Sequence, residues 1–137
     1  MRHIEFRGKC KLLGKWMYGS LYIKRSGAVF INSTEVYPET VGQFTGLVDE
    51  NLSKIYEGDL LQYDDYKPQV VKWYNCMFVV EDNQYVYPLY DWYDGTRIIG
   101  NITDGITDRA IKENTEWFAE YKSIKEEMGK LGLDVHG

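Results

Sequence analysis

The sequence has few of the residues that build metal sites, disulfide frameworks and most active sites. Its 137 residues include only two cysteines, Cys10 and Cys76, and two histidines, His3 and His136. Cysteines so few and so far apart exclude a disulfide framework or a metal knuckle, and we expect two free thiols. Chain ends are poorly held, so terminal histidines seldom support precise chemistry. We therefore expect no metal, no cofactor and no catalytic histidine.

A long apolar run is also missing. No segment approaches the roughly 20 residues that a membrane-spanning helix needs. The first eleven residues are basic, and no apolar signal core follows them. We expect a protein that does not associate with membranes and stays in the cytosol of the cell that makes it.

What the sequence does have is an ordinary globular composition. It is 44% hydrophobic and 27% charged, and its 4 Trp, 12 Tyr and 5 Phe residues supply bulky core material. A chain of this length has room for one core and at most a small appendage. We expect a single domain.

The positive charge is concentrated at the start of the chain. Residues 1–26 hold seven Lys or Arg and one acid, whereas residues 27–137 hold nine against twenty. The split of +6 against −11 fits either an electropositive patch for an anionic partner or a head-to-tail contact between copies. The simplest interpretation, which we favour, is that these cations face water. They are Arg2, Arg7, Lys9, Lys11, Lys15, Lys24 and Arg25.

Alternation with a period of two dominates the first hundred residues and predicts short antiparallel strands. The segments that show it, or that form short apolar runs, are 4–7, 16–18, 21–23, 28–31, 40–47, 55–56, 60–63, 70–80, 85–87 and 97–102. Asp82-Asn83 is the expected turn of the clearest hairpin. Gly58 is expected to bend the chain sharply before an apolar strand. The pattern predicts a mainly β, α+β protein with a small, antiparallel, barrel-like body.

The period changes after Thr107 and predicts a C-terminal helix, with Thr107 or Asp108 as its cap. Five large side chains recur at spacings of 4, 3, 4 and 3 and form one stripe: Trp117, Tyr121, Ile124, Met128 and Leu131. The stripe must pack on the β body or on another copy. We expect a β domain over residues 1–104 and a helical extension over residues 105–137, which is also a candidate oligomer contact.

Residues that carry catalysis are hard to find. Glu57 and Asp59 share one side of a strand, but acidic pairs beside Gly and Tyr are more typical of turns. Cys76 has no well-placed base and is interpreted as a buried strand thiol. The segment Gly42–Gly46 is not a phosphate-binding loop. We do not expect an enzyme.

Aromatic residues gather in the second half of the strand region: Trp73, Tyr74, Tyr85, Tyr87, Tyr90, Trp92 and Tyr93. They fit either a stacking platform or, as we favour, a sheet whose aromatics alternate between core and surface. Residues 57–94 carry eight acids against Lys67 and Lys72, so this segment repels a phosphate backbone. A nucleic acid would have to bind the N-terminal third, through Arg7, Lys9, Lys11 and Lys15.

Five blocks, in order, carry a family resemblance. They are Arg2-x-Ile-x-Phe-Arg-Gly-Lys9, Gly14-Lys-Trp-x-Tyr-Gly19, Thr40-Val-Gly-Gln-Phe-Thr-Gly-Leu-x-Asp49, Lys54-Ile-Tyr-Glu-Gly-Asp59 and Ile99-Gly-Asn-Ile102. Together they resemble the YopX family of phage and prophage proteins, from residue 2 to about residue 104. The loop at Glu50–Ser53 departs from the family, which usually carries glycine after the asparagine, where this chain has Leu52.

The resemblance implies a mainly β, prophage-encoded protein of a bacterial host, with homo-oligomers and no assigned reaction. It supplies no catalytic residues. Its motif residues also have a structural interpretation, the glycines as turns and bulges and the apolar residues as anchors; they are Gly42, Phe44, Gly46, Ile55, Tyr56, Gly58, Asp59, Gly100 and Asn101. Two hypotheses stay open. The first is a self-associating protein that binds a host or phage protein, and the second is a small-barrel nucleic-acid-binding protein.

Overall fold

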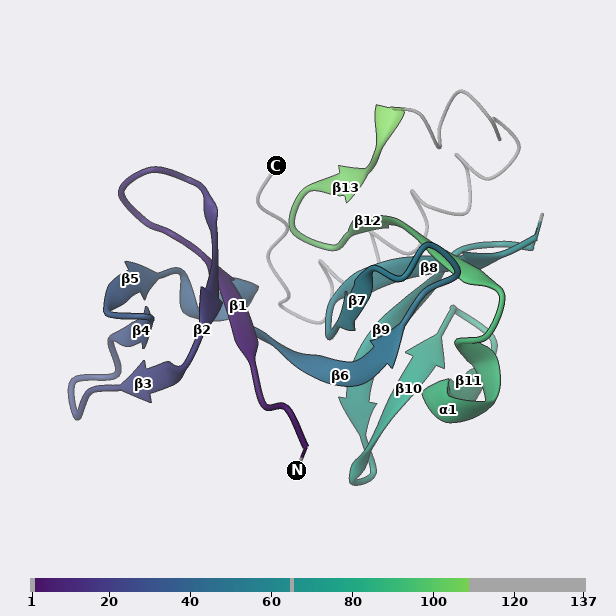
Figure 1. Cartoon of the computed structure of the whole chain (residues 1–137), viewed down its shortest axis with the longest axis horizontal. Helices are drawn as coiled ribbons and strands as arrows, with labels where there is room; N and C mark the ends of the chain where they lie inside the picture. The colour runs from purple at the N-terminus through teal and green to yellow at the C-terminus, as the bar shows by residue number, and fades with distance from the viewer. Residues whose placement is uncertain (1, 65, 109–137) are drawn as a thin grey trace.

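In the computed structural model, residues 2–64 and 66–108 are described, and in them the chain is mainly antiparallel β (Figure 1). The strands are β1 (Phe6–Lys9), β2 (Trp16–Gly19), β3 (Leu21–Ile23), β4 (Val29–Ile31), β5 (Thr34–Val36), β6 (Gly42–Val48), β7 (Lys54–Tyr56), β8 (Asp59–Tyr63), β9 (Gln69–Tyr74), β10 (Met77–Glu81), β11 (Val86–Pro88), β12 (Thr96–Asn101) and β13 (Gly105–Ile106). Within these described residues, two short helices interrupt the strands, the 3₁₀ turn η1 (Pro38–Thr40) and α1 (Leu89–Trp92). The expected β class is therefore confirmed.

The strands form three sheets, of order β2-β1-β6-β7, β11-β10-β9-β8-β12-β13 and β3-β4-β5. None of the three closes on itself within the described residues, so the expected barrel is not found. One reason is that residues 21–36 make a separate sheet. Another is that β6 changes partner along its length, from β1 at Gly42 to β7 at Phe44 and Val48, which extends one open sheet. Figure 1 shows β6 running from the N-terminal strands to the rest of the body.

The small N-terminal sheet has its own core of Val29, Ile31 and Val36. Its β4–β5 turn consists of Asn32 and Ser33, whose φ angles of 52° and 68° lie in the left-handed region. Asparagine tolerates this conformation because its short polar side chain bonds locally. The polar residues expected to end the apolar run at 28–31 thus form a two-residue hairpin turn.

The six-stranded sheet is apolar on both faces. Leu60 and Val70 belong to one buried cluster, and their neighbours Leu61 and Val71 belong to another. Successive side chains of a strand point to opposite faces, which explains why adjacent residues serve different clusters. The second cluster also holds Leu89, so α1 covers that face.

The expected single run over residues 70–80 is wrong. It is a hairpin of β9 and β10, turning at Asn75 and Cys76 with φ angles of 54° and 64°. Cys76 was expected to be a buried strand thiol, but it is exposed because it occupies the turn, whereas Cys10 is buried. The next turn lies where it was expected, since Asp82 accepts from the Gln84 and Tyr85 amides between β10 and β11.

The expected C-terminal helix and its stripe, Trp117, Tyr121, Ile124, Met128 and Leu131, lie outside the described residues. The expected domain boundary after residue 104 falls at β13, which pairs with β12 and so belongs to the sheet. In the described part of the chain, no helix is both long and apolar enough to cross a membrane.

Candidate functional site

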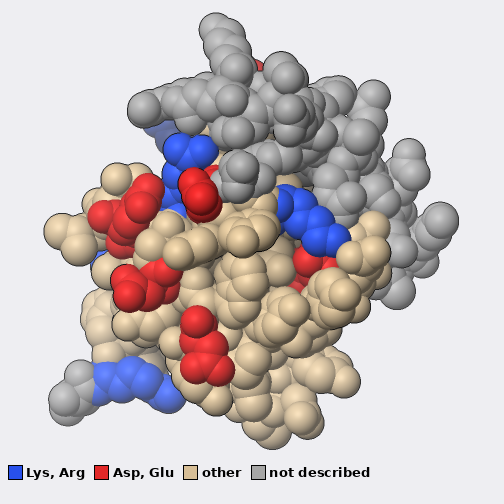
Figure 2. All heavy atoms as spheres, turned by 90° about the vertical axis from the view of Figure 1, so that its right-hand side faces the viewer, with Lys and Arg blue, Asp and Glu red and all other residues tan. Residues whose placement is uncertain are grey.

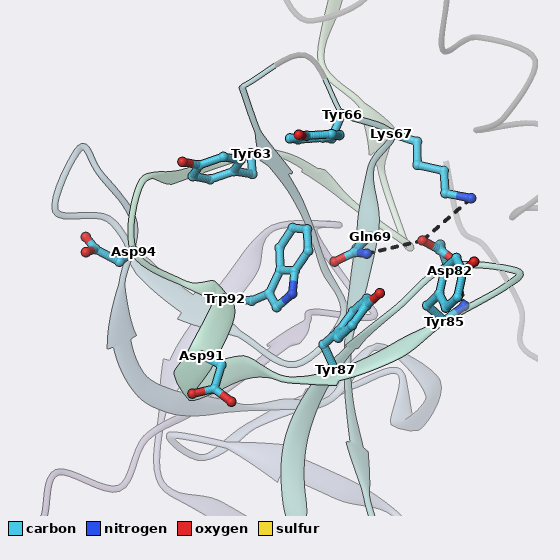
Figure 3. A pocket seen from close by; sticks show the side chains of 10 residues that line it. All are labelled: Tyr63, Tyr66, Lys67, Gln69, Asp82, Tyr85, Tyr87, Asp91, Trp92 and Asp94. Atoms are coloured by element: carbon cyan, nitrogen blue, oxygen red, sulfur yellow. Dashed lines mark hydrogen bonds and ion pairs between the residues drawn. The ribbon is translucent and has the colours of Figure 1, made fainter.

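A pocket of about 710 Å³ lies where the β8–β9 connection, the β10–β11 turn and α1 meet (Figure 3). Its lining combines aromatic and acidic side chains: Tyr63, Tyr66, Lys67, Gln69, Asp82, Tyr85, Tyr87, Asp91, Trp92 and Asp94. We call it the aromatic pocket. It is on the side of the molecule that carries α1, which Figure 1 shows at the right and Figure 2 turns toward the viewer.

Ring contacts hold the walls of the aromatic pocket. Tyr63 and Tyr66 stack with centroids 5.9 Å apart and planes 21° from parallel. Tyr87 and Trp92 stack at 5.4 Å and 29°. Tyr63 meets the edge of Trp92 at 6.2 Å and so joins the two pairs. Neighbouring rings restrict one another, so the wall is largely formed before any ligand arrives.

The floor is a buried amide with an unused acceptor. Gln69 Nε2 donates to Asp82 Oδ2 at 3.2 Å. A carboxylate only accepts, so the amide nitrogen must face Asp82 and the amide oxygen faces the other way. That oxygen, Gln69 Oε1, is buried and accepts no hydrogen bond from residues 2–64 or 66–108. Figure 3 shows the amide next to Trp92, at the centre of the lining residues.

Asp82 supports this floor as an ionised group. Burial alone would raise its pKa, but hydrogen bonds from the Gln84 and Tyr85 amides and from Gln69 together lower it. Lys67 Nζ lies 3.7 Å from its Oδ2 and 3.1 Å from Gln84 Oε1. The cation and the carboxylate at this edge of the pocket are thus engaged with the β10–β11 turn.

The sequence pointed to only part of this site. Tyr85, Tyr87 and Trp92 line the pocket, but Trp73, Tyr74 and Tyr90 are exposed outside the lining and Tyr93 packs against the core. The seven aromatics therefore do not form one platform. The sequence did not single out Tyr63, Tyr66 and Gln69, although the run Tyr-Asp-Asp-Tyr over residues 63–66 is a visible signal.

A second group of residues comes from different blocks of the family resemblance, and their side chains contact one another in the folded chain. Arg7 is buried and donates to Asp59 Oδ1 at 2.7 Å, while the Tyr56 amide donates to Oδ2 at 2.7 Å. The guanidinium lies 4.7 Å from the Trp16 ring centre and 4.9 Å from that of Tyr56. These four residues are the Arg7 cluster. Arg7 was expected to face water, which is wrong because a carboxylate and two aromatic faces enclose it.

The remaining cations of the anion-binding patch, which the sequence offered as the alternative interpretation, are largely neutralised. Lys9 pairs with Asp104, which also accepts from the Trp16 indole at 2.7 Å. Lys11 pairs with Glu35 at 3.0 Å. Lys15 is exposed. The fold thus does not gather Arg7, Lys9, Lys11 and Lys15 into one unpaired basic surface.

The motif glycines lie at tight places in the backbone. Gly58 turns the chain into β8 with φ of 94°. At Gly42 an added Cβ would lie 2.3 Å from the Glu57 carbonyl oxygen, so no side chain fits. Gly46 lies within the register shift of the β6–β7 pair. Gly100 lies at the register shift of the β12–β8 pair.

The motif residues Phe44, Ile55 and Asn101 hold the neighbouring elements together. Phe44 and Ile55 are buried, and Phe44 lies opposite Tyr56 in the β6–β7 pair. Asn101 Oδ1 accepts from the amides of Thr103 and Asp104 and so shapes the turn into β13.

The two carboxylates of the expected acidic pair differ in their surroundings. Burial raises the pKa of Glu57, and the Gln43 amide partly offsets it. Burial also raises the pKa of Asp59, against the effect of Arg7 and the Tyr56 amide, and both of its oxygens are occupied. Residues 2–64 and 66–108 contain no group of three or more His, Cys, Asp or Glu that could hold a metal ion.

Comparison with known families agrees with the five sequence blocks. The family model described as YopX protein matches residues 6–105, most of the chain. The chain belongs to the YopX family. No curated protein sequence matches it. The matched part of this YopX-family chain contains both the Arg7 cluster and every residue that lines the aromatic pocket.

Proposed function

We propose that this YopX-family protein acts by binding rather than by catalysis, and that it recognises a protein partner through the aromatic pocket. The observation that carries the proposal is the exposed tyrosine wall around the buried Gln69 amide oxygen, which has no donor in the described part of the chain. As part of the same proposal, the protein is prophage-encoded, works in the bacterial cytosol and self-associates.

Exposure of the aromatic side chains supports a protein partner. Tyr66 and Tyr85 are 58% and 56% exposed. Large aromatic side chains contribute the most favourable free energy when they are buried, so their exposure leaves surface that a partner can cover. Tyr and Trp are the residues enriched at the energetic centres of protein interfaces. A pocket with exposed tyrosines above a half-buried tryptophan can therefore anchor one side chain of a partner.

The use of the carboxylates supports a role without catalysis. A general acid or base must have its proton-accepting atoms available to the substrate. Asp59 is bonded to Arg7 and to the Tyr56 amide, and Asp82 accepts from two backbone amides. The hydrogen bonds of Asp59 hold the start of β8, and those of Asp82 hold the β10–β11 turn. Both carboxylates therefore have a structural role.

A capture experiment tests the proposed function. The tagged full chain and its Tyr66→Ala and Tyr90→Ala variants serve as baits in lysate of a bacterium that carries the gene, with its prophage induced. Tyr90 is an exposed tyrosine of α1 outside the lining, so its variant is a matched control. We expect a protein that is captured by wild type and by Tyr90→Ala but lost with Tyr66→Ala. Equal capture by all three baits would reject the pocket as the binding site.

Self-association is tested separately, by size exclusion with light scattering on the full chain and on a chain truncated after Thr107. We expect an oligomer at micromolar concentration for the full chain and a smaller soluble species after truncation. A monomeric full chain would contradict self-association, and an insoluble truncated chain would indicate that the removed residues cover this chain's own core.

A further inference from the structure

We propose that the aromatic pocket binds an arginine side chain of the protein partner. This inference rests on the function proposed above and adds the chemistry of the ligand. Four independent features of the described residues support it: the wall, the floor, the balance of charge and the Arg7 cluster.

The wall offers flat aromatic faces. The stacked Tyr63 and Tyr66 lie above Trp92 in Figure 3, and Tyr87 stacks on Trp92 from the other side. A guanidinium is planar and weakly hydrated, so it stacks on such faces, where it is attracted to the electrons of the ring. An ammonium ion is strongly hydrated and gains less from the same wall.

The floor requires a hydrogen-bond donor. Gln69 is 5% exposed, and no donor among the described residues reaches its Oε1. A buried polar atom without a partner is rare and destabilising unless a ligand or water completes it. A guanidinium carries five N–H donors and no acceptor, so it can donate to this oxygen while its plane rests on the aromatic wall. An anionic or purely accepting ligand cannot.

The charges around the pocket favour a cation. Among the described residues that line it, three carry carboxylates (Asp82, Asp91 and Asp94) and one, Lys67, carries an ammonium group. Lys67 is already paired with Asp82 and Gln84. Asp91 and Asp94 are exposed, and Figure 3 shows them at the periphery, so they attract a cation on its approach more than they bind it in place.

The molecule already binds one guanidinium in this way. In the Arg7 cluster, the group lies 4.7 Å from one aromatic centre and 4.9 Å from another, and donates to Asp59 at 2.7 Å. The aromatic pocket offers the same kinds of group, with an amide oxygen as acceptor and no side chain of the described residues filling it. Arginine is therefore the side chain whose chemistry fits the pocket best.

A titration of the full chain with acetyl-Gly-Arg-Gly-amide, and with the same peptide carrying neutral citrulline, tests the proposal. The probes are isothermal calorimetry and the NMR resonance of the Trp92 indole N–H, assigned with Trp92→Phe. We expect the arginine peptide to shift this resonance within the millimolar range, and citrulline to bind at least about tenfold more weakly. Tyr66→Ala should weaken arginine binding about fivefold, and Tyr90→Ala should not change it.

Equal affinity for arginine and citrulline, or no shift with either peptide, would overturn the arginine assignment. The proposed function would then still stand if partner capture depended on Tyr66, and would fall if it did not. A second copy of the chain is a different occupant, since Arg25 is exposed at the β3–β4 turn. If both Tyr66→Ala and Arg25→Gln abolish self-association, the occupant of the pocket is Arg25 of a second copy. That result would overturn the proposal of a separate partner.

Discussion

Arg7 and Asp59 are charged residues whose side chains are largely removed from water. The side chains are 9% and 2% exposed, and the ion pair joins β1 to β8, 52 positions apart in the chain. Removing two ions from water is costly, and close pairing with further hydrogen bonds has to offset that cost. The pair therefore makes the correct packing of β1 against β8 a condition for a stable fold.

Breaking this pair should be far more damaging than removing an exposed charge. Arg7→Met leaves the Asp59 carboxylate buried without its cation, and we expect a loss of about 3–5 kcal/mol in the free energy of unfolding, measured by urea denaturation. The control Lys15→Met removes an exposed cation and should change it by less than about 0.5 kcal/mol. A loss below about 1 kcal/mol for Arg7→Met would show that the pair is not a structural centre.

Asp104 should make stability depend on pH. Burial alone would raise its pKa, but hydrogen bonds from Lys9, Trp16 and Asn101 together lower it below the ordinary 3.8. Since the folded pKa is lower than the unfolded one, its contribution is complete above the unfolded value and is lost as pH falls through the folded value. Asp104→Asn should therefore flatten the acid side of the curve of unfolding midpoint against pH. A curve as steep as that of wild type would contradict this role.

At the scale of elements, several connections use left-handed residues other than glycine. Asn32-Ser33 and Asn75-Cys76 make two-residue hairpin turns, and Leu52 has φ of 64° in the β6–β7 loop. Asp49 holds that loop, because its Oδ1 accepts from the Asn51 and Ser53 amides at 2.9 Å each. A leucine in this conformation is strained, because its Cβ lies too close to the following carbonyl oxygen.

Leu52→Gly should consequently stabilise the protein. The side chain is 80% exposed, so little packing is lost. Relief of the left-handed strain should stabilise the folded chain by about 1–2 kcal/mol. The greater conformational freedom of glycine in the unfolded chain offsets about 0.5–1 kcal/mol of that gain. We expect a net gain of up to about 1.5 kcal/mol in the free energy of unfolding, measured by thermal and urea denaturation.

The matched control for this substitution is Leu12→Gly. Leu12 is also exposed, at 87%, but is not among the residues with positive φ. The same change should be neutral or destabilising there. A melting temperature that falls with Leu52→Gly would show that the loop does not require a left-handed residue at this position.

Most strands could be predicted from sequence, because period-two alternation and turn residues such as Gly58 and Asp82 are local signals. The turn at Asn75-Cys76 was missed because apolar and aromatic residues continue on both sides of it. The aromatic pocket was beyond such reasoning for another reason. It forms only when Tyr63, Gln69 and Trp92, from separate elements, meet in space.

The charge of the whole molecule is distributed differently from what the N-terminal excess suggests. Asp59, Asp104 and Glu35 neutralise Arg7, Lys9 and Lys11 within the fold. On the face shown in Figure 2, acidic and basic side chains are both scattered over a surface whose described part is mostly uncharged. Nucleic-acid affinity comes mainly from cations that contact phosphates, and a net charge of −5 opposes it.

We therefore expect only weak binding to nucleic acid. Fluorescence anisotropy with single- and double-stranded oligonucleotides at about 100 mM salt should give no dissociation constant tighter than about 10 micromolar, within or weaker than the non-specific range. Submicromolar affinity that disappears when Lys9, Lys11 and Lys15 are changed to Glu, with the fold intact, would support nucleic-acid binding instead.

The most direct test of a protein partner at the aromatic pocket is photo-crosslinking in the living cell. A photoreactive benzoylphenylalanine replaces Tyr66 at the edge of the pocket in one experiment, and Tyr90, exposed on the same side but outside the lining, in another. We predict that irradiation joins the chain to a partner protein from position 66 and not from position 90, and that changing Asp94 to Asn weakens the product. Equal products from both positions, or none from position 66 in cells where the protein is expressed and folded, would contradict the account.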